Sequence, residues 1–151
     1  RATKAGRVLE DGTTQLHQFD FNALGLPTVQ IDPEGRKTLT SYTSDNRYVT
    51  EVRQQNGANQ ELLAKNEYFT SGAFVGTGLV WKSTDASGNV TEFAYNSKGQ
   101  VTQITSLDGY TYFTYVATGN GAGHLQKVER QGLTVAEPKV TLTTIAYDTK
   151  G

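Results

Sequence analysis

The stretch FAYNSKGQV, residues 93–101, decides the fold because it joins two short strand-like segments through a glycine turn. Phe93 and Tyr95 are two residues apart, so they would share one face of a β-strand. Gly99 follows Tyr95 by four residues and permits the left-handed backbone conformation that a tight turn requires. A second strand-like segment follows from Val101 to Thr105. The stretch therefore predicts a β-hairpin.

The same step from an aromatic residue to a glycine or asparagine recurs along the chain. The aromatic residues lie 20–32 residues apart, and recurrence at a period of this size indicates a repeat protein. Each aromatic residue is predicted to end a strand, and the residue four positions later is predicted to form the turn. The repeat-defining pairs are Phe21 with Gly25, Tyr42 with Asn46, Tyr68 with Gly72, Tyr95 with Gly99, Tyr115 with Gly119 and Tyr147 with Gly151.

A second strand and a second turn are predicted to complete each repeat. The second strands are expected over residues 26–31, 48–52, 79–84, 101–105 and 125–129. The turns that follow are rich in Gly, Asn and Asp, the residues that suit hairpin turns, and occupy 32–35, 55–57, 85–88, 107–109 and 130–132. Residues 60–65 contain helix formers, but they precede Tyr68 as the approach strands precede the other aromatic residues. They are therefore interpreted as a strand.

The repeats predict one array over residues 1–151. Its parts are a partial repeat at 1–12, repeats at about 13–35, 36–57, 58–88, 89–109 and 110–132, and a truncated repeat at 133–151. Glycine-rich insertions at 72–78 and 119–123 are expected to be loops at one rim of the sheet, and the return segment 133–138 is also long.

Composition excludes several classes of protein. The chain has 14 Lys and Arg against 15 Asp and Glu, and it has no basic cluster, so we expect no nucleic-acid partner. No apolar run approaches the roughly 20 residues of a membrane-spanning helix. Without Cys there is no disulfide framework and no thiolate zinc site. Arg1 is not an initiator residue and no signal peptide follows it, so the start is interpreted as a processing product or a chosen boundary.

These residues resemble the YD repeat of Rhs proteins, toxin-complex components, wall-associated bacterial proteins and teneurins. Residues 147–151, YDTKG, match the family pattern best, and residues 95–101 and 21–26 are near matches. The resemblance implies an all-β fold in which tandem hairpins form a continuous, mostly antiparallel sheet that spirals into part of a shell. It also implies that bacterial members enclose a toxic C-terminal domain and that teneurin shells carry adhesion surfaces.

No catalytic set is visible in the sequence, so we predict that the chain is not an enzyme and needs no cofactor or metal. His17 alternates with Phe19 and Phe21 and is interpreted as a packed or hydrogen-bonded residue of the sheet, whereas His124 is interpreted as solvated. Rhs proteins can carry a self-cleavage motif with Asp-Pro, but residues 32–35, DPEG, are interpreted as a turn.

Acidic and aromatic residues offer two kinds of candidate binding site. Asp85, Asp108 and Asp148 recur with the repeats and are interpreted as turn residues, because calcium needs six to eight oxygen ligands from a clustered loop. Three aromatic residues are candidates for glycan stacking on an exposed sheet, although cross-strand packing is the favoured interpretation; these residues are Trp81, Tyr110 and Tyr112.

The predicted function is structural. The chain is expected to be a segment of a β-shell that encloses or displays a cargo, such as a C-terminal toxin domain, in a secreted or cell-surface bacterial protein. Its partners would be the flanking repeats of the same polypeptide, the enclosed domain, or other chains that pair with its sheet edges. The alternative is an extracellular adhesin or filament subunit that binds glycans or identical chains through its exposed sheet.

Overall fold

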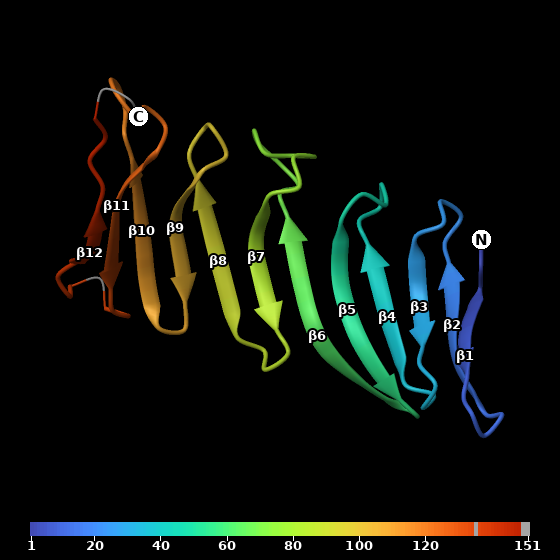
Figure 1. Cartoon of the computed structure of the whole chain (residues 1–151). Coiled ribbons are helices and arrows are strands. Elements are labelled where there is room, and N and C mark those ends of the chain that lie inside the picture. Colours follow the sequence, from blue (N-terminus) through green and yellow to red (C-terminus); the bar gives the residue numbers. More distant parts are fainter. Residues whose placement is uncertain (135, 149–151) are drawn as a thin grey trace. The chain divides into compact units, whose positions relative to one another are not determined.

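The computed structural model describes residues 1–134 and 136–148, and within them the chain forms strands and no helix (Figure 1). The strands follow one another in the sheet in the order of the sequence, and each register that the structure defines is antiparallel. The predicted all-β antiparallel repeat fold is therefore confirmed. The strands are β1 (Lys4–Val8), β2 (Thr14–Phe21), β3 (Pro27–Ile31), β4 (Lys37–Tyr42), β5 (Val49–Asn56), β6 (Asn59–Tyr68), β7 (Val80–Asp85), β8 (Val90–Tyr95), β9 (Val101–Ser106), β10 (Gly109–Tyr115), β11 (Leu125–Gln131) and β12 (Val140–Thr144).

The chain divides into two compact units. The first unit contains Arg1–Tyr68 together with Ser83–Gly88. The second contains Phe69–Lys82 together with the described residues from Asn89 onward. Among the described residues there is no helix that is long and apolar enough to cross a membrane.

In the first unit, β1 to β6 are joined by successive hairpins. Phe19 and Phe21 lie on one face of β2 with their ring centroids 6.4 Å apart. The opposite face of β5 and β6 carries a charged row, in which Arg53 binds Glu51, and Lys65, the register partner of Glu51, binds Glu67 at 3.3 Å. The register also pairs Leu39 with Arg53, so the face with the charged row carries apolar side chains as well.

In the second unit, β8 to β12 pair in the same way. Phe93 and Ile104 face each other across β8 and β9, and Phe113 faces Val128 across β10 and β11. The other face carries polar residues, including the ion pair of Lys127 with Glu129 at 2.9 Å. Each pair of neighbouring strands buries its apolar side chains only in part, because no second layer covers them.

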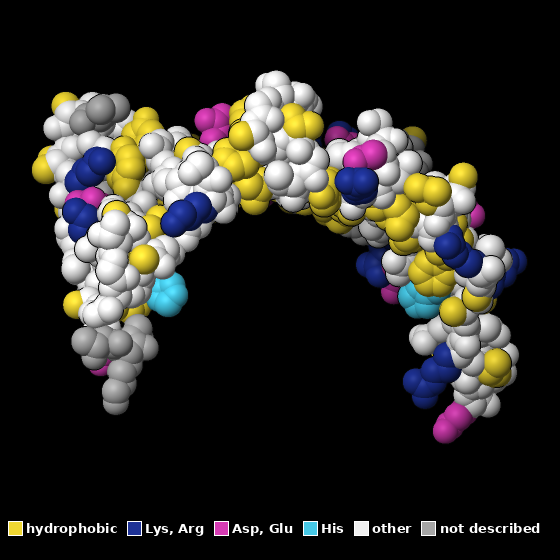
Figure 2. All heavy atoms as spheres, turned by 90° about the horizontal axis from the view of Figure 1, so that it is seen from above, with side chains coloured by type: hydrophobic (Ala, Val, Ile, Leu, Met, Phe, Trp, Pro, Cys, Tyr) yellow, Lys and Arg dark blue, Asp and Glu magenta, His cyan; other side chains and the backbone are white. Residues whose placement is uncertain are grey.

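The described part of the chain has no closed hydrophobic core. No hydrophobic side chain there is fully buried, and hydrophobic side chains are visible among polar ones at the surface (Figure 2). The only buried polar residue there is Gln131, which is 6% exposed. Stability must therefore come from the hydrogen-bonded ladder and from contacts between neighbouring strands, as in other repeat proteins.

Two local features bear on the predictions made from the sequence. Residues 60–65 lie within β6, which confirms that they form a strand. The strand predicted to run into Tyr147 is wrong at its end, because β12 stops at Thr144. The amide of Ile145 still donates to the carbonyl of Gln126 at 2.8 Å, and beyond this point the Tyr147 ring packs edge-on against His124 at 5.2 Å.

The insertion at residues 72–78 lies in the loop between β6 and β7 and has a packing role. The Phe74 ring lies 5.3 Å from Phe69 and 5.9 Å from Tyr95, measured between ring centroids. Phe69 and Tyr95 also meet edge-on at 5.9 Å. Phe74 of this insertion thus covers part of the Phe69 and Tyr95 rings. It shields them partly from water, as a hydrophobic core would.

Candidate functional site

The turns after β2 and β8 share one hydrogen-bonding pattern. In the turn after β2, the side-chain oxygen Oδ1 of Asn22 accepts hydrogen bonds from the amides of Leu24 and Leu26, at 3.1 and 2.9 Å. In the turn after β8, Oδ1 of Asn96 accepts from the amides of Lys98 and Gln100, at 3.0 and 3.1 Å. In these two turns the asparagine after the aromatic residue therefore caps the turn, which is the behaviour expected of Asn and Asp.

The fourth residue after each of the first five repeat aromatic residues has the left-handed backbone that such a turn requires. The φ angles are 77° at Gly25, 58° at Asn46, 81° at Gly72, 77° at Gly99 and 80° at Gly119. Asn46 is the only described residue other than glycine with a positive φ, and asparagine tolerates this region better than other side chains. Gly151, the corresponding residue of the last pair, lies outside the described residues.

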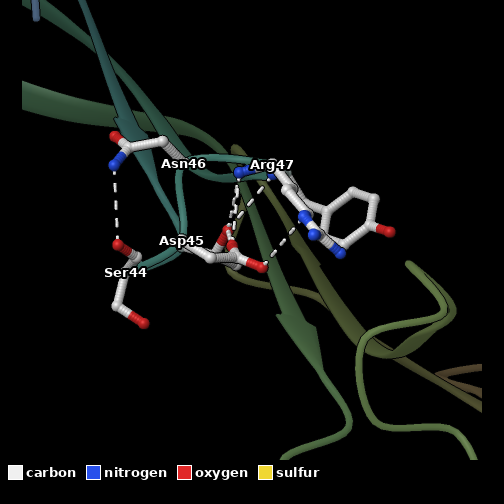
Figure 3. A network of polar contacts seen from close by, with 6 residues as sticks. Ser44, Asp45, Asn46 and Arg47 are labelled. Carbon is white, nitrogen blue, oxygen red and sulfur yellow. Dashed lines mark hydrogen bonds and ion pairs between the residues drawn. The ribbon is translucent and has the colours of Figure 1, made fainter. Parts of the chain in front are cut away.

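Asn46 adds a contact that glycine lacks. Its Oδ1 accepts a hydrogen bond from Nδ2 of Asn22 at 2.8 Å, so the turn after β4 is tied to the turn after β2. Figure 3 shows the turn itself, in which the amide of Arg47 donates to Oδ1 of Asp45 at 3.2 Å. Nδ2 of Asn46 lies 3.5 Å from the carbonyl oxygen of Ser44 in the same view.

The turns at the other ends of the strands use the same chemistry. Oδ1 of Asp32 accepts from the amides of Glu34 and Arg36, both at 2.9 Å, and its Oδ2 accepts from Nε of Arg36 at 2.7 Å. The Arg36 hydrogen bond is the main cause that lowers the pKa of Asp32 below its usual value. The interpretation of residues 32–35 as a turn is thus confirmed. Asp85 caps the amide of Ser87 in the same manner, at 2.9 Å.

Both units contain tyrosine hydroxyls that bond to the backbone of another strand, and sequence reasoning missed these contacts. Four of these tyrosines end a strand, and each donates its hydroxyl to the carbonyl oxygen of the first residue of the preceding strand. Tyr147 follows β12, and its hydroxyl donates to the first residue of β11. The donors and acceptors are Tyr42 to Pro27, Tyr68 to Val49, Tyr95 to Val80, Tyr115 to Val101 and Tyr147 to Leu125, at 2.8, 2.8, 2.6, 2.8 and 2.8 Å. We call these five contacts the tyrosine latches.

The latches explain why the repeated aromatic residue is mostly tyrosine. Phenylalanine would supply the same ring but no donor, and Phe21, the first aromatic residue of the series, has none. The signal was present in the sequence, because tyrosine occupies all five later positions. Its meaning could not be read there, since the acceptor carbonyl lies 14 to 22 residues earlier in the chain.

The predicted glycan-stacking residues lie in different surroundings. The rings of Tyr110 and Tyr112 stack with their centroids 6.2 Å apart. The ammonium of Lys139 lies 3.5 Å from the Tyr112 ring centroid, and the Tyr112 hydroxyl donates to Oε1 of Gln131 at 2.8 Å. Trp81 lies in β7, with the ammonium of Lys82 at 5.5 Å from its ring centroid. Glycan stacking on these residues stays a prediction.

The histidines and acidic residues form no metal-binding group in the described residues. His124 is exposed, and His17 lies half-buried in β2, where its Nδ1 atom has no hydrogen-bond partner among the described residues. There is also no cluster of three or more His, Cys, Asp or Glu side chains there that could hold a metal ion. Asp108 contributes a long ion pair of 3.9 Å with Arg130 rather than a turn cap through its carboxylate.

Comparison with known families finds one match. The RHS Repeat family model matches residues 76–111, which cover the end of the inserted loop and β7 to β9 with the start of β10. This match confirms the resemblance to Rhs-type repeats. No curated protein sequence matches the chain.

Comparison with solved structures identifies the fold. The chain is similar to a chain of the Photorhabdus luminescens Tc holotoxin pore carrying the TccC3 D651A mutation, with a TM-score of 0.61 and 14% identity over 82% of this chain. It is also similar to chains of the TcdB2-TccC3-Cdc42 and TcdB2-TccC3 complexes, each with a TM-score of 0.66 and 12% identity over 97% of this chain. The chain spans only 6% of the matched chain in the first of these structures and 8% of the matched chain in the other two. At these identities the likeness establishes the repeat β-sheet fold.

Proposed function

From the RHS Repeat match and this fold, we propose that the chain is a wall segment of a β-repeat scaffold that encloses or displays a cargo, such as a toxin domain, in a secreted bacterial protein. The similar structures are components of toxin complexes, and this supports the proposal. The chain would act together with flanking repeats of the same polypeptide.

The observation that carries the proposal is the combination of an open ladder with the tyrosine latches. In the described part of the chain each hairpin pairs with its neighbours in the sheet, and no hydrophobic residue there is fully buried. A latch then ties the end of a strand to an earlier strand in four described repeats that lack any covering layer. Such a sheet suits a wall, because it adds area with each repeat without needing a closed core.

The edge strand β12 provides the first test. All five of its residues are exposed, including Val140 at 60% and Leu142 at 59%, and it contains no charged residue. A strand edge of this kind pairs readily with another strand. We therefore expect the isolated chain to self-associate with rising concentration in sedimentation velocity experiments.

A matched pair of variants makes this test specific. Leu142→Lys places a charge on the β12 edge and should reduce association, whereas Leu107→Lys changes a leucine that is 69% exposed in the turn between β9 and β10 and should not. A wild-type chain that remains monomeric at every concentration would contradict a wall whose edges are normally covered by neighbouring repeats.

The cargo requires a second experiment on the natural gene product. If the wall encloses a cargo domain, limited proteolysis should leave that domain uncut until the wall is opened. Gly109→Ala should open the wall, because an added Cβ would lie 2.3 Å from the carbonyl oxygen of Gln131. Equal cleavage of the cargo segment with and without this substitution would argue against enclosure.

A further inference from the structure

A small polar recess lies at the end of the β5–β6 hairpin in the first unit. It has a volume of about 170 Å³ and is lined by four polar residues, Gln54, Asn56, Asn59 and Glu61. The register pairs Gln54 with Glu61 and Asn56 with Asn59, and alternation along each strand places all four on one face. The sheet therefore presents three carboxamides and one carboxylate in a compact square.

These side chains differ from the polar residues at other hairpin ends. Asp32 and Asn96 use their oxygens to cap their own turns. The four side chains of the recess make no hydrogen bond or ion pair with any described residue. Gln55, on the opposite face of the same hairpin, does bond to its turn, because its Nε2 donates to the carbonyl of Gly57 at 3.0 Å. The recess thus holds uncommitted donors and acceptors.

The chemistry of the recess selects a neutral ligand with several hydroxyl groups. Each carboxamide offers both N–H donors and an oxygen acceptor, and the carboxylate offers acceptors only. A hydroxyl group both donates and accepts, so a polyol uses both kinds of group. The negative charge of Glu61 would repel an anion. A calcium ion needs six to eight oxygens, and the four side chains supply at most about five while their amide nitrogens stay unused.

The size of the recess limits the ligand further. Its volume is smaller than the roughly 300 Å³ at which pockets for drug-sized ligands begin. One sugar ring is the polyol of matching size. We propose that this recess binds a single pyranose unit of a neutral saccharide. This inference goes beyond the scaffold function and does not depend on whether the wall encloses a cargo.

The test is an NMR titration of the full chain with methyl glycosides of glucose, galactose and mannose. The side-chain NH2 signals of Gln54, Asn56 and Asn59 should shift and saturate with at least one of these probes, with a Kd of about 1–10 mM. Gln54→Ala and Glu61→Ala should each raise that Kd about two- to tenfold, which is the effect of one lost hydrogen bond.

Gln60→Ala is the matched control, because Gln60 belongs to the same hairpin but pairs with Gln55 on the opposite face. It should leave the Kd unchanged. Unchanged dispersion of the backbone amide signals will show that each variant is folded. The inference is overturned if none of the three glycosides gives a saturable shift, if Gln54→Ala and Glu61→Ala leave the shifts unaltered, or if calcium chloride alone produces them.

Discussion

The tyrosine latches should contribute measurably to stability, and Tyr95→Phe is the most direct test. The substitution keeps the ring, its contacts with Phe69 and Phe74, and the strand ladder. It removes only the hydroxyl that donates to the carbonyl of Val80 at 2.6 Å. The change therefore separates the energetic contribution of the hydrogen bond from that of ring packing.

The expected magnitude follows from the environment of the hydroxyl. A typical hydrogen bond contributes about 0.5–1.5 kcal/mol net to stability. Tyr95 is half-buried, so water can partly replace the lost donor and the higher penalty of a fully buried acceptor does not apply. Adding Tyr115→Phe, which removes a second latch in the same unit, should bring the loss to about 1–3 kcal/mol if the two effects add.

Urea unfolding followed by far-UV circular dichroism measures the loss, with Tyr110→Phe as the control. The Tyr110 hydroxyl has no hydrogen-bond partner among the described residues, and its ring stacks on Tyr112 just as Tyr95 packs on its neighbours. We expect the control to change the free energy of unfolding by less than about 0.5 kcal/mol. If Tyr95→Phe and Tyr115→Phe cost no more than the control, the latches are geometric coincidences and the reasoning fails.

Three further outcomes follow from the turns and the phenols. Asn46→Ala should lower the free energy of unfolding by about 1–3 kcal/mol, because alanine would have to adopt a φ of 58°. An unchanged thermal unfolding curve would contradict this. Gly109→Ala should lower the melting temperature more than Gly88→Ala. Both glycines have a positive φ, but only at Gly109 would an added Cβ lie against neighbouring backbone. Equal decreases in melting temperature would refute this prediction. Partial burial raises the pKa of Tyr68 and of Tyr95 above the ordinary 10.0, so their neutral forms are favoured in the folded state. Their contribution to stability should be fully present below about pH 10 and be lost as the pH rises through the folded pKa, and unfolding curves that do not change above pH 10 would contradict it.

Most of the fold could be predicted because its signals are local. A strand of period two, an asparagine or aspartate, and a glycine four residues after an aromatic residue together specify one hairpin. Asn46 illustrates how far this local reasoning extends, because its position in the repeat predicts a left-handed turn and its φ is 58°. The scaffold interpretation rested on the same local repetition and on the resemblance that it revealed.

Contacts between hairpins were beyond that reasoning. The latch from Tyr115 to Val101 and the tie from Asn22 to Asn46 join residues that are 14 and 24 positions apart, so no short pattern contains both partners. The recess at Gln54 and Glu61 was likewise invisible, because it exists only once β5 and β6 pair in one particular register.

The sequence by itself therefore determined where the chain forms strands and turns, since those choices depend on backbone preferences within a few residues. Only the tertiary structure decided which hydroxyl reaches which carbonyl and which polar side chains remain uncommitted. Both depend on the registers and bulges that place neighbouring strands beside one another, such as the shift between Ala94 and Tyr95 at the end of β8.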